Sequence, residues 1–207
     1  MSSPNLSIAD GNPGSFETLI LGIGNILWAD EGFGIRAIEE LHARYAFDDT
    51  VRVMDGGTQG IFLLPWVRDA KRLLIFDAID FGLAPATLKV IRDDAVPRFM
   101  GAKKVSMHQA GFQEVLSSAQ LTGDLPEQLV LIGVQPELLD DYGGSLRDSV
   151  KAKIDPAIDL AMEILAEWDV AGQPREKSLA SSDHVGPTAL DMQDYENERP
   201  STRGETP

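Results

Sequence analysis

Apolar residues along the chain gather in short runs that are typical of buried β-strands. Four such runs, at residues 18–23, 51–54, 73–79 and 129–134, are followed by Gly, Asp or other polar residues that end a strand. Runs of this kind indicate a parallel sheet with both faces covered. Residues 87–92 alternate apolar and polar side chains instead, as a half-exposed strand at the edge of a sheet does.

Between these runs the apolar residues recur at the spacing of an α-helix. Helices are predicted over residues 32–45, 109–121 and 145–168, and a short helix or turn over 61–67. Strands that alternate with helices in this way indicate an α/β fold. The prediction is a mainly parallel five-stranded sheet with helices on both faces and one antiparallel edge strand.

The two ends of the chain differ from this core. Residues 1–16 are rich in Ser, Pro, Gly and Asn and are predicted to form a flexible leader. Residues 170–207 contain few large apolar side chains and many Pro, Ser, Asp and Glu. Such a segment buries too little surface to offset its ordering entropy, so a disordered acidic tail is expected. Residues 17–169 then form a single α/β domain.

Composition excludes several classes of function. Cysteine is absent from the 207 residues, which excludes disulfides, thiolate metal sites and cysteine nucleophiles. The formal net charge of −15 opposes binding to nucleic acids and to anionic membranes. Neither a secretory signal nor an apolar run of about 18 residues, as membrane insertion requires, is visible. A cytoplasmic protein is therefore expected.

Polar residues at the predicted strand ends are the candidates for chemistry, because ligands of such folds bind beyond the carboxyl ends of the strands. Asp77 lies inside the run LLIFDAI, where an acid is costly unless it is paired, hydrogen-bonded or bound to a metal. Glu31 follows the first strand, and His108 precedes a predicted helix. Two carboxylates and an imidazole on one rim of a sheet suit a divalent transition metal.

Each of these residues also has a purely structural explanation. Acids such as Asp30 and Glu31 in a first helical turn favour the helix dipole. The carboxylate of Asp77 can cap a neighbouring loop, and a lone histidine such as His108 is more often structural than a ligand. The three residues are far apart in the sequence and form no specific metal motif, so periodicity alone leaves both explanations open.

The loop after the first strand also begins like a dinucleotide-binding motif. Gly22 and Gly24 match the first two glycines of G-x-G-x-x-G, but Leu27 occupies the third position. Asp55 ends the second strand, where an acid that binds ribose would stand. Nucleotide binding is thus one interpretation, and glycines that allow a tight turn are the other.

Five stretches of the chain, taken in order, resemble the [NiFe]-hydrogenase maturation endopeptidases. They are GIGNILWADEGFGIRAIEEL, then Asp55-Gly-Gly-Thr58, LLIFDAID, Val105-Ser-Met-His108-Gln109 and LIGVQPE. The resemblance runs over about residues 18–165, nearly the whole predicted core. The resemblance does not extend to the leader or the tail.

This resemblance implies a twisted mixed sheet and a metal-dependent endopeptidase activity. Members of the family remove a C-terminal peptide from the nickel-loaded precursor of the hydrogenase large subunit. The implied partner is therefore that precursor, and the implied metal is nickel that the precursor supplies. The family's nickel-binding positions fall on Glu31, Asp77 and His108. Its Asp-Gly-Gly motif makes Asp55 a candidate catalytic residue that orients a water or steadies the substrate.

Two other functions remain open at this point. A non-enzymatic nickel chaperone or assembly factor would use the same three ligands, Glu31, Asp77 and His108. A nucleotide-binding enzyme would use Gly22, Gly24 and Asp55.

Overall fold

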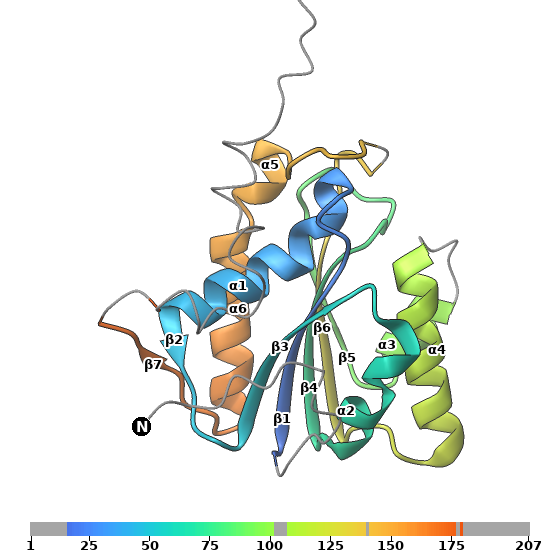
Figure 1. Ribbon diagram of the computed structural model, residues 1–207, viewed down its shortest axis with the longest axis vertical. Helices are drawn as coiled ribbons and strands as arrows, with labels where there is room; N and C mark the ends of the chain where they lie inside the picture. Colours follow the sequence, from blue (N-terminus) through green and yellow to red (C-terminus); the bar gives the residue numbers. More distant parts are fainter. Residues whose placement is uncertain (1–15, 102–106, 140, 177–178, 180–207) are drawn as a thin grey trace, which may run out of the picture.

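A five-stranded sheet forms the centre of the protein (Figure 1). The computed structural model describes residues 16–101, 107–139, 141–176 and 179. Strands β3, β1, β4 and β6 lie side by side and run parallel, and β5 pairs with β6 in the antiparallel direction at one edge. The predicted fold class is therefore confirmed. The strands are β1 (Thr18–Ile23), β3 (Val51–Gly57), β4 (Arg72–Ala78), β5 (Leu88–Arg92) and β6 (Gln128–Val134).

Helices cover both faces of this sheet (Figure 1). One face carries α1 (Phe33–Arg44) and α6 (Ile154–Glu167) with the short α5 (Asp148–Lys151). The other face carries α2 (Leu64–Asp69), α3 (Ala95–Gly101) and α4 (Met107–Thr122). Two 3-10 turns, η2 (Ala29–Gly32) and η3 (Gly60–Leu63), follow β1 and β3. No helix in the described part of the chain is long and apolar enough to cross a membrane.

The alternation of side chains along the strands divides the hydrophobic core into two clusters. On β4, Leu73 and Ile75 join the cluster beneath α2 and α4, whereas Leu74 and Phe76 join the cluster beneath α1 and α6. All four side chains are fully buried. Both faces of the strand are apolar, which explains the continuous run in its sequence.

The sequence predicts one long helix over residues 145–168. This prediction is wrong in one respect, because the segment forms two helices. A turn at residues 152–153 separates α5 from α6. Pro156 stands in the first turn of α6, where its missing N–H costs nothing. If the two helices were continuous, the proline ring would clash with the carbonyl group of residue 152. The predicted apolar face is confirmed, since Val150, Ile158 and Leu165 are buried.

The folded part of the chain extends beyond the boundary predicted at residue 169. Strand β7 (Gln173–Pro174) pairs with β2 (Tyr45–Ala46) in an antiparallel two-stranded sheet. The Nε atom of Arg175 donates hydrogen bonds to the carbonyl oxygens of His42 and Tyr45, over 2.9 and 3.1 Å. The start of the predicted tail is thus joined to the end of α1. The predicted leader, apart from residue 16, and most of the rest of the tail lie outside the described residues.

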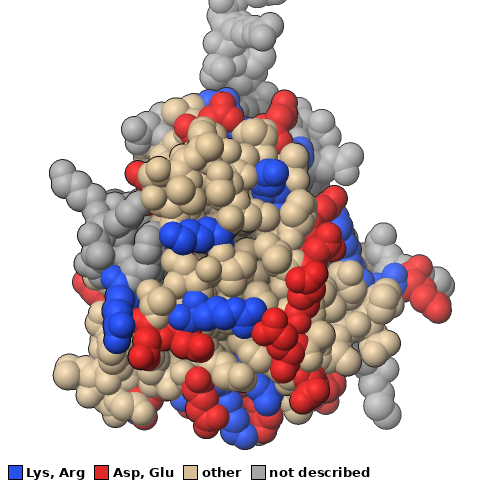
Figure 2. All heavy atoms as spheres, turned by 180° about the vertical axis from the view of Figure 1, so that it is seen from behind, with Lys and Arg blue, Asp and Glu red and all other residues tan. Residues whose placement is uncertain are grey.

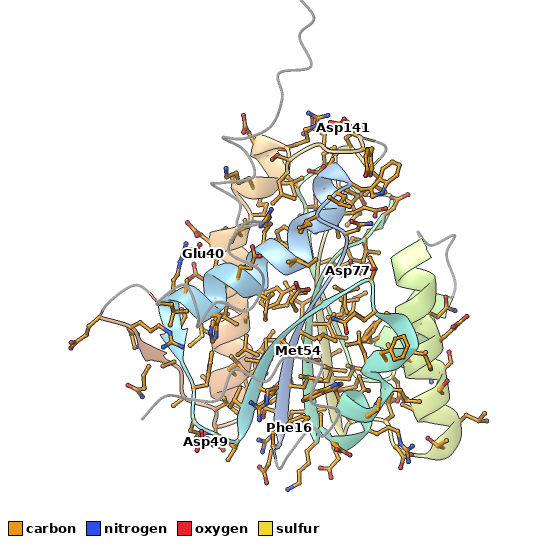
Figure 3. The ribbon with its side chains drawn as sticks, viewed as in Figure 1. Phe16, Glu40, Asp49, Met54, Asp77 and Asp141 are labelled. Carbon is orange, nitrogen blue, oxygen red and sulfur yellow. The ribbon has the colours of Figure 1, made fainter. Side chains whose placement is uncertain are left out.

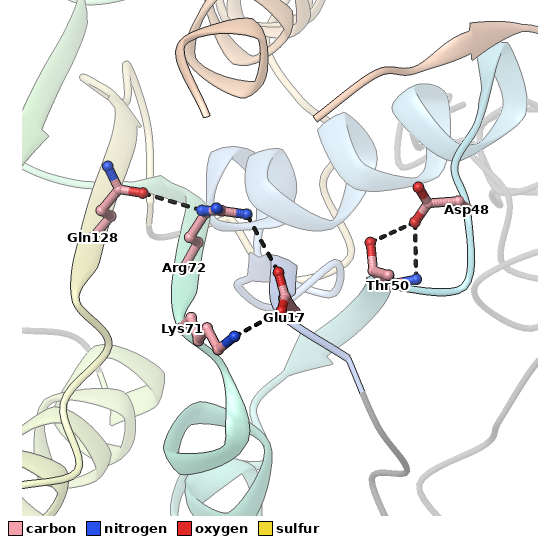
Figure 4. Close-up of polar contacts among 6 residues, drawn as sticks. All are labelled: Glu17, Asp48, Thr50, Lys71, Arg72 and Gln128. Atoms are coloured by element: carbon pink, nitrogen blue, oxygen red, sulfur yellow. Dashed lines mark hydrogen bonds and ion pairs between the residues drawn. The ribbon is translucent and has the colours of Figure 1, made fainter. Parts of the chain in front are cut away.

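Polar side chains form hydrogen bonds and ion pairs at the end of the sheet where its parallel strands begin (Figure 4). Lys71 Nζ lies 2.6 Å from a carboxylate oxygen of Glu17 and lowers the pKa of that carboxyl group. Arg72 Nε donates to Gln128 Oε1 over 3.1 Å. Exposed contacts of this kind contribute little to stability. The buried acids discussed below lie at the opposite end of the strands.

Candidate active site

Two glycines bring the first helix close to the end of β1. A Cβ atom at Gly22 would lie 2.5 Å from the carbonyl oxygen of Gly34 in α1. At Gly24, where φ is +150°, a Cβ atom would lie 2.0 Å from the carbonyl oxygen of Glu31. The two glycines that match the dinucleotide motif therefore allow close packing of backbone, and this packing accounts for them without a nucleotide.

Asp30 joins the loop after β1 to the loop after β6. Its side chain is completely buried. One carboxylate oxygen accepts the backbone N–H groups of Glu137 and Leu138, and the other accepts the N–H of Arg147, all over 2.8 Å. The interpretation of Asp30 as a residue that only favours the helix dipole missed this role. Its partners lie more than 100 positions away in the chain, and no local pattern marks them.

Asp77 lies near the carboxyl end of β4 and is fully buried (Figure 3). Alternation along the strand places it on the same face as Leu73 and Ile75, toward the layer of α2 and α4. The expectation of a buried acid at this end of the sheet is confirmed. A carboxylate in such a place interacts strongly with any cation that reaches it, because surrounding water screens it poorly.

An aromatic ring packs beside Asp77. In the parallel pairing of β4 with β6, Asp77 lies opposite Gly133. A Cβ atom at Gly133 would lie 2.4 Å from the ring of Phe81, so the glycine makes the space that this ring fills. Phe81 therefore covers the strand position next to Asp77 and contributes to its burial.

Gln135 holds the loop that carries Phe81. Its side chain is buried, and its Oε1 atom accepts the backbone N–H groups of Phe81 and Leu83 over 2.7 and 3.1 Å. Its Nε2 atom donates to a carboxylate oxygen of Asp80 over 3.1 Å. Asp80 is exposed. A single amide side chain thus sets the position of the loop after β4.

Glu31 reaches the same end of the sheet from η2. This turn packs against the end of β4. A Cβ atom at Gly34, three residues further on, would lie only 2.3 Å from the carbonyl oxygen of Phe76, the residue before Asp77. The side chain of Glu31 is partly exposed. The structure thus brings together the segments that carry two of the three predicted metal ligands.

His108 lies in the first turn of α4. The preceding described element is α3, separated from α4 by residues 102–106, which are not described. Figure 1 shows α4 starting toward the end of the sheet where β4 finishes. Gly111, one turn further along α4, packs against Gly60 of η3, since a Cβ atom at Gly111 would lie 3.2 Å from the Gly60 Cα.

The side chain of His108 itself lies outside the described residues. Among the side chains that are described, no group of three His, Cys, Asp or Glu residues could hold a metal ion. The three-ligand site therefore stays a prediction. What the structure adds is the placement of Asp77 and of the segments that carry Glu31 and His108.

Asp55 lies within β3, on the face of the sheet that α1 covers. Burial raises the pKa of its carboxyl group, while a backbone hydrogen bond from Gly57 and the nearby charge of Arg36 in α1 act in the opposite direction. Because Asp77 points to the other face, the two carboxyl groups are on opposite sides of the sheet. Asp55 is thus placed to hold the glycine turn that ends β3.

Replacing Asp55 with Asn is expected to raise the melting temperature at pH 7. Because burial raises the pKa of Asp55 above its ordinary value of 3.8, the folded protein binds a proton more readily than the unfolded chain does. Stability therefore falls as the pH rises from 3.8 through the folded-state pKa, and asparagine removes this loss. The gain in melting temperature should shrink toward pH 4, and a gain that is independent of pH would contradict this explanation.

Comparison with known proteins defines the class to which this fold and site belong. The family described as "Hydrogenase maturation protease" matches residues 35–164. Hydrogenase expression/formation protein HupM of Azotobacter chroococcum is 56% identical over 183 residues, which are 88% of this chain and 86% of that protein. Hydrogenase expression/formation protein HupD of Bradyrhizobium diazoefficiens is 56% identical over 178 residues, which are 86% and 93% of the two chains.

A solved structure agrees with these sequence matches. The hydrogenase maturating endopeptidase HybD of Escherichia coli superposes with a TM-score of 0.74 at 40% identity, covering 79% of this chain and all of its own. The chain belongs to the hydrogenase maturation protease family. The resemblance found in the sequence is confirmed, and with it the class of hydrolase.

Proposed function

We propose that this protein is a cytoplasmic endopeptidase that removes a C-terminal peptide from the nickel-loaded precursor of a [NiFe]-hydrogenase large subunit. In this proposal the nickel ion in the precursor is the feature that the enzyme recognises. Membership of the hydrogenase maturation protease family supports the reaction class. The observation that carries the proposal is the fully buried carboxyl group of Asp77 at the end of the sheet where ligands bind.

The donor set fits a divalent nickel ion that arrives with the substrate. Carboxylate oxygens and imidazole nitrogen are suitable ligands for such a cation. Asp77 supplies a carboxylate in a buried place, Glu31 supplies another from η2, and His108 supplies an imidazole from the start of α4. Three protein ligands leave positions that the precursor's own ligands fill. The isolated protein should therefore retain nickel only weakly.

The chain's other residues position the peptide for hydrolysis. In the reaction the oxygen of a water molecule bonds to the carbonyl carbon, the carbon–nitrogen bond breaks, and a proton passes to the leaving amine. Asp55 steadies Gly57 at the end of β3, where the absence of a side chain lets backbone approach the peptide closely. Phe81 reduces the access of bulk water beside Asp77, which strengthens electrostatic interactions there.

The purified protein is expected to shorten nickel-loaded precursor and to leave nickel-free precursor uncut. Recognition requires the cation, because in this proposal the cation is the group in the substrate that Glu31, Asp77 and His108 bind. Mass spectrometry of the precursor after incubation measures the loss of the C-terminal peptide. Efficient cutting of nickel-free precursor would contradict recognition through nickel.

The same experiment separates the enzyme from a nickel chaperone. A chaperone would bind the precursor or change its nickel content without shortening it. The nucleotide-binding alternative receives no support from the loop after β1, because contacts with α1 and η2 already account for Gly22 and Gly24. A shift in melting temperature on addition of a nucleotide would reopen that alternative.

A further inference from the structure

Large hydrophobic side chains are exposed at the end of the molecule where the parallel strands finish. They lie in the segments that follow β1, β3, β4 and β6. We call this set the apolar rim, and it consists of Leu27, Trp28, Phe62, Leu83, Leu138 and Tyr142. Exposed apolar surface that gathers around one site in this way marks a place of interaction.

One side of the apolar rim is held in a fixed arrangement. The rings of Trp28 and Tyr142 meet edge to face with their centroids 5.2 Å apart, and the two residues form an antiparallel backbone bridge. The N–H of Gly143 donates to the carbonyl oxygen of Leu27 over 2.6 Å. The side chain of Asp30, two residues after Trp28, accepts three backbone hydrogen bonds from the chain on either side of Tyr142. These bonds hold the segment after β6 against the segment after β1. This side therefore needs little ordering when a partner binds.

The other side of the apolar rim is Phe62, which is 73% exposed on η3. This turn packs against α4 through the contact between Gly60 and Gly111. The exposed ring therefore stands next to the helix whose first turn carries His108. An aromatic side chain held at the surface in this way gains its stabilisation when a partner covers it.

The charges within the apolar rim indicate what the partner presents. Glu31 and Asp77 both come from elements at this end of the sheet. Glu31 is partly exposed there, whereas Asp77 is buried. An apolar surface with acidic groups near it is complementary to an apolar surface with a cationic centre. On the rear of the molecule, Figure 2 shows acidic and basic side chains side by side over the lower half.

We propose that the apolar rim is the docking surface for the folded substrate protein, whose matching surface is apolar around a cationic centre. This proposal rests on the proposed function and adds that recognition extends beyond the peptide that is cut. The rim draws on four neighbouring strands, whose three gaps add up to about 14 Å. A folded protein surface can contact all four segments at once, and the acidic groups near them favour a surface with a cationic centre.

The test compares three forms of the full chain: the parent, the double variant Phe62→Ser/Tyr142→Ser, and Leu121→Ser. Phe62 and Tyr142 are 73% and 67% exposed, so their replacement leaves the core intact, which a melting curve checks. Leu121 is 89% exposed near the far end of α4 and serves as the matched control. The probe is the nickel-loaded large-subunit precursor of a [NiFe]-hydrogenase from the same organism, with binding and cutting measured separately.

The double variant is expected to bind this precursor at least about tenfold more weakly than the parent, since exposed aromatic anchors dominate such interfaces. Leu121→Ser should stay within about twofold of the parent. The variant Phe62→Leu/Tyr142→Phe should recover most of the binding. A synthetic peptide spanning the cleavage site should compete poorly with the precursor.

Several outcomes would overturn the docking surface. They are parental binding by the double variant, an equal loss in Leu121→Ser, a peptide that binds as tightly as the precursor, or a parent protein that forms dimers through the rim. Failure of the proposed function looks different, because the parent would then bind the precursor through the rim and leave it uncut. Cutting that is unaffected by the double variant would instead reject the docking surface and keep the function.

Discussion

The variant Asp77→Asn is expected to process nickel-loaded precursor at least about 100-fold more slowly than the parent while it still folds. Asparagine has nearly the same shape as aspartate, so the packing beside Phe81 and Gly133 is preserved. It lacks the negative charge that a divalent cation requires from its oxygen ligand. The rate is measured by mass spectrometry of the precursor, and the fold by circular dichroism.

The matched control for this prediction is Asp80→Asn, three positions further along the chain in the loop after β4. Asp80 is exposed, and one of its carboxylate oxygens accepts hydrogen bonds from the Gly82 backbone and from Gln135, which an asparagine oxygen can also accept. Its replacement should leave the processing rate within a few-fold of the parent. Equal losses in both variants would show that loop structure, and not the Asp77 charge, determines the activity.

The variant Asp30→Ala should lower the free energy of unfolding by about 3 kcal/mol or more. The change removes the acceptor of three backbone N–H groups, at Glu137, Leu138 and Arg147, and leaves them without it in a partly buried place. Urea unfolding measures the loss of stability. Hydrogen exchange at these three amides should accelerate more than exchange at amides in the centre of the sheet.

Asp48→Ala provides the comparison for Asp30→Ala. The carboxylate of Asp48 also accepts a backbone N–H, that of Thr50 over 2.9 Å, but in an exposed turn where water can replace it (Figure 4). A loss of no more than about 1 kcal/mol is expected there. If both variants lose the same free energy of unfolding, burial does not determine how much the hydrogen bonds of Asp30 contribute to stability.

The fold follows closely from the sequence where local pattern decides the structure. The run around Leu73 to Ala78 is apolar on both faces because both faces are covered, and the alternation in residues 87–92 matches an edge strand. Contacts distant in the sequence decide the remainder. The pairing of β2 with β7 depends on residues more than 120 positions apart, and β2 and β7 are only two residues long. Strands of two residues are too short to show an alternation of apolar and polar side chains.

Less of the candidate site than of the fold is predictable from the sequence. A buried acid in an apolar run identifies Asp77, whereas Glu31 and its neighbour Asp30 stand side by side, and the sequence pattern does not show that Asp30 binds the loop after β6. The separation of Asp55 and Asp77 onto opposite faces follows from strand alternation combined with the placement of α1 and α4, which depends on the three-dimensional packing. The role of Gln135 is likewise visible only once the loop after β4 lies beside β6.

The pairing of β2 with β7 has a consequence for the order of events during synthesis on the ribosome. The five central strands and α6 all precede residue 168, so the main core can assemble before β7 emerges. Until Gln173 to Arg175 are released, β2 lacks its pairing strand, and the carbonyl groups of His42 and Tyr45 lack the side chain of Arg175. The nascent chain therefore presents an open strand edge for this interval, and its closure is one of the last steps in folding.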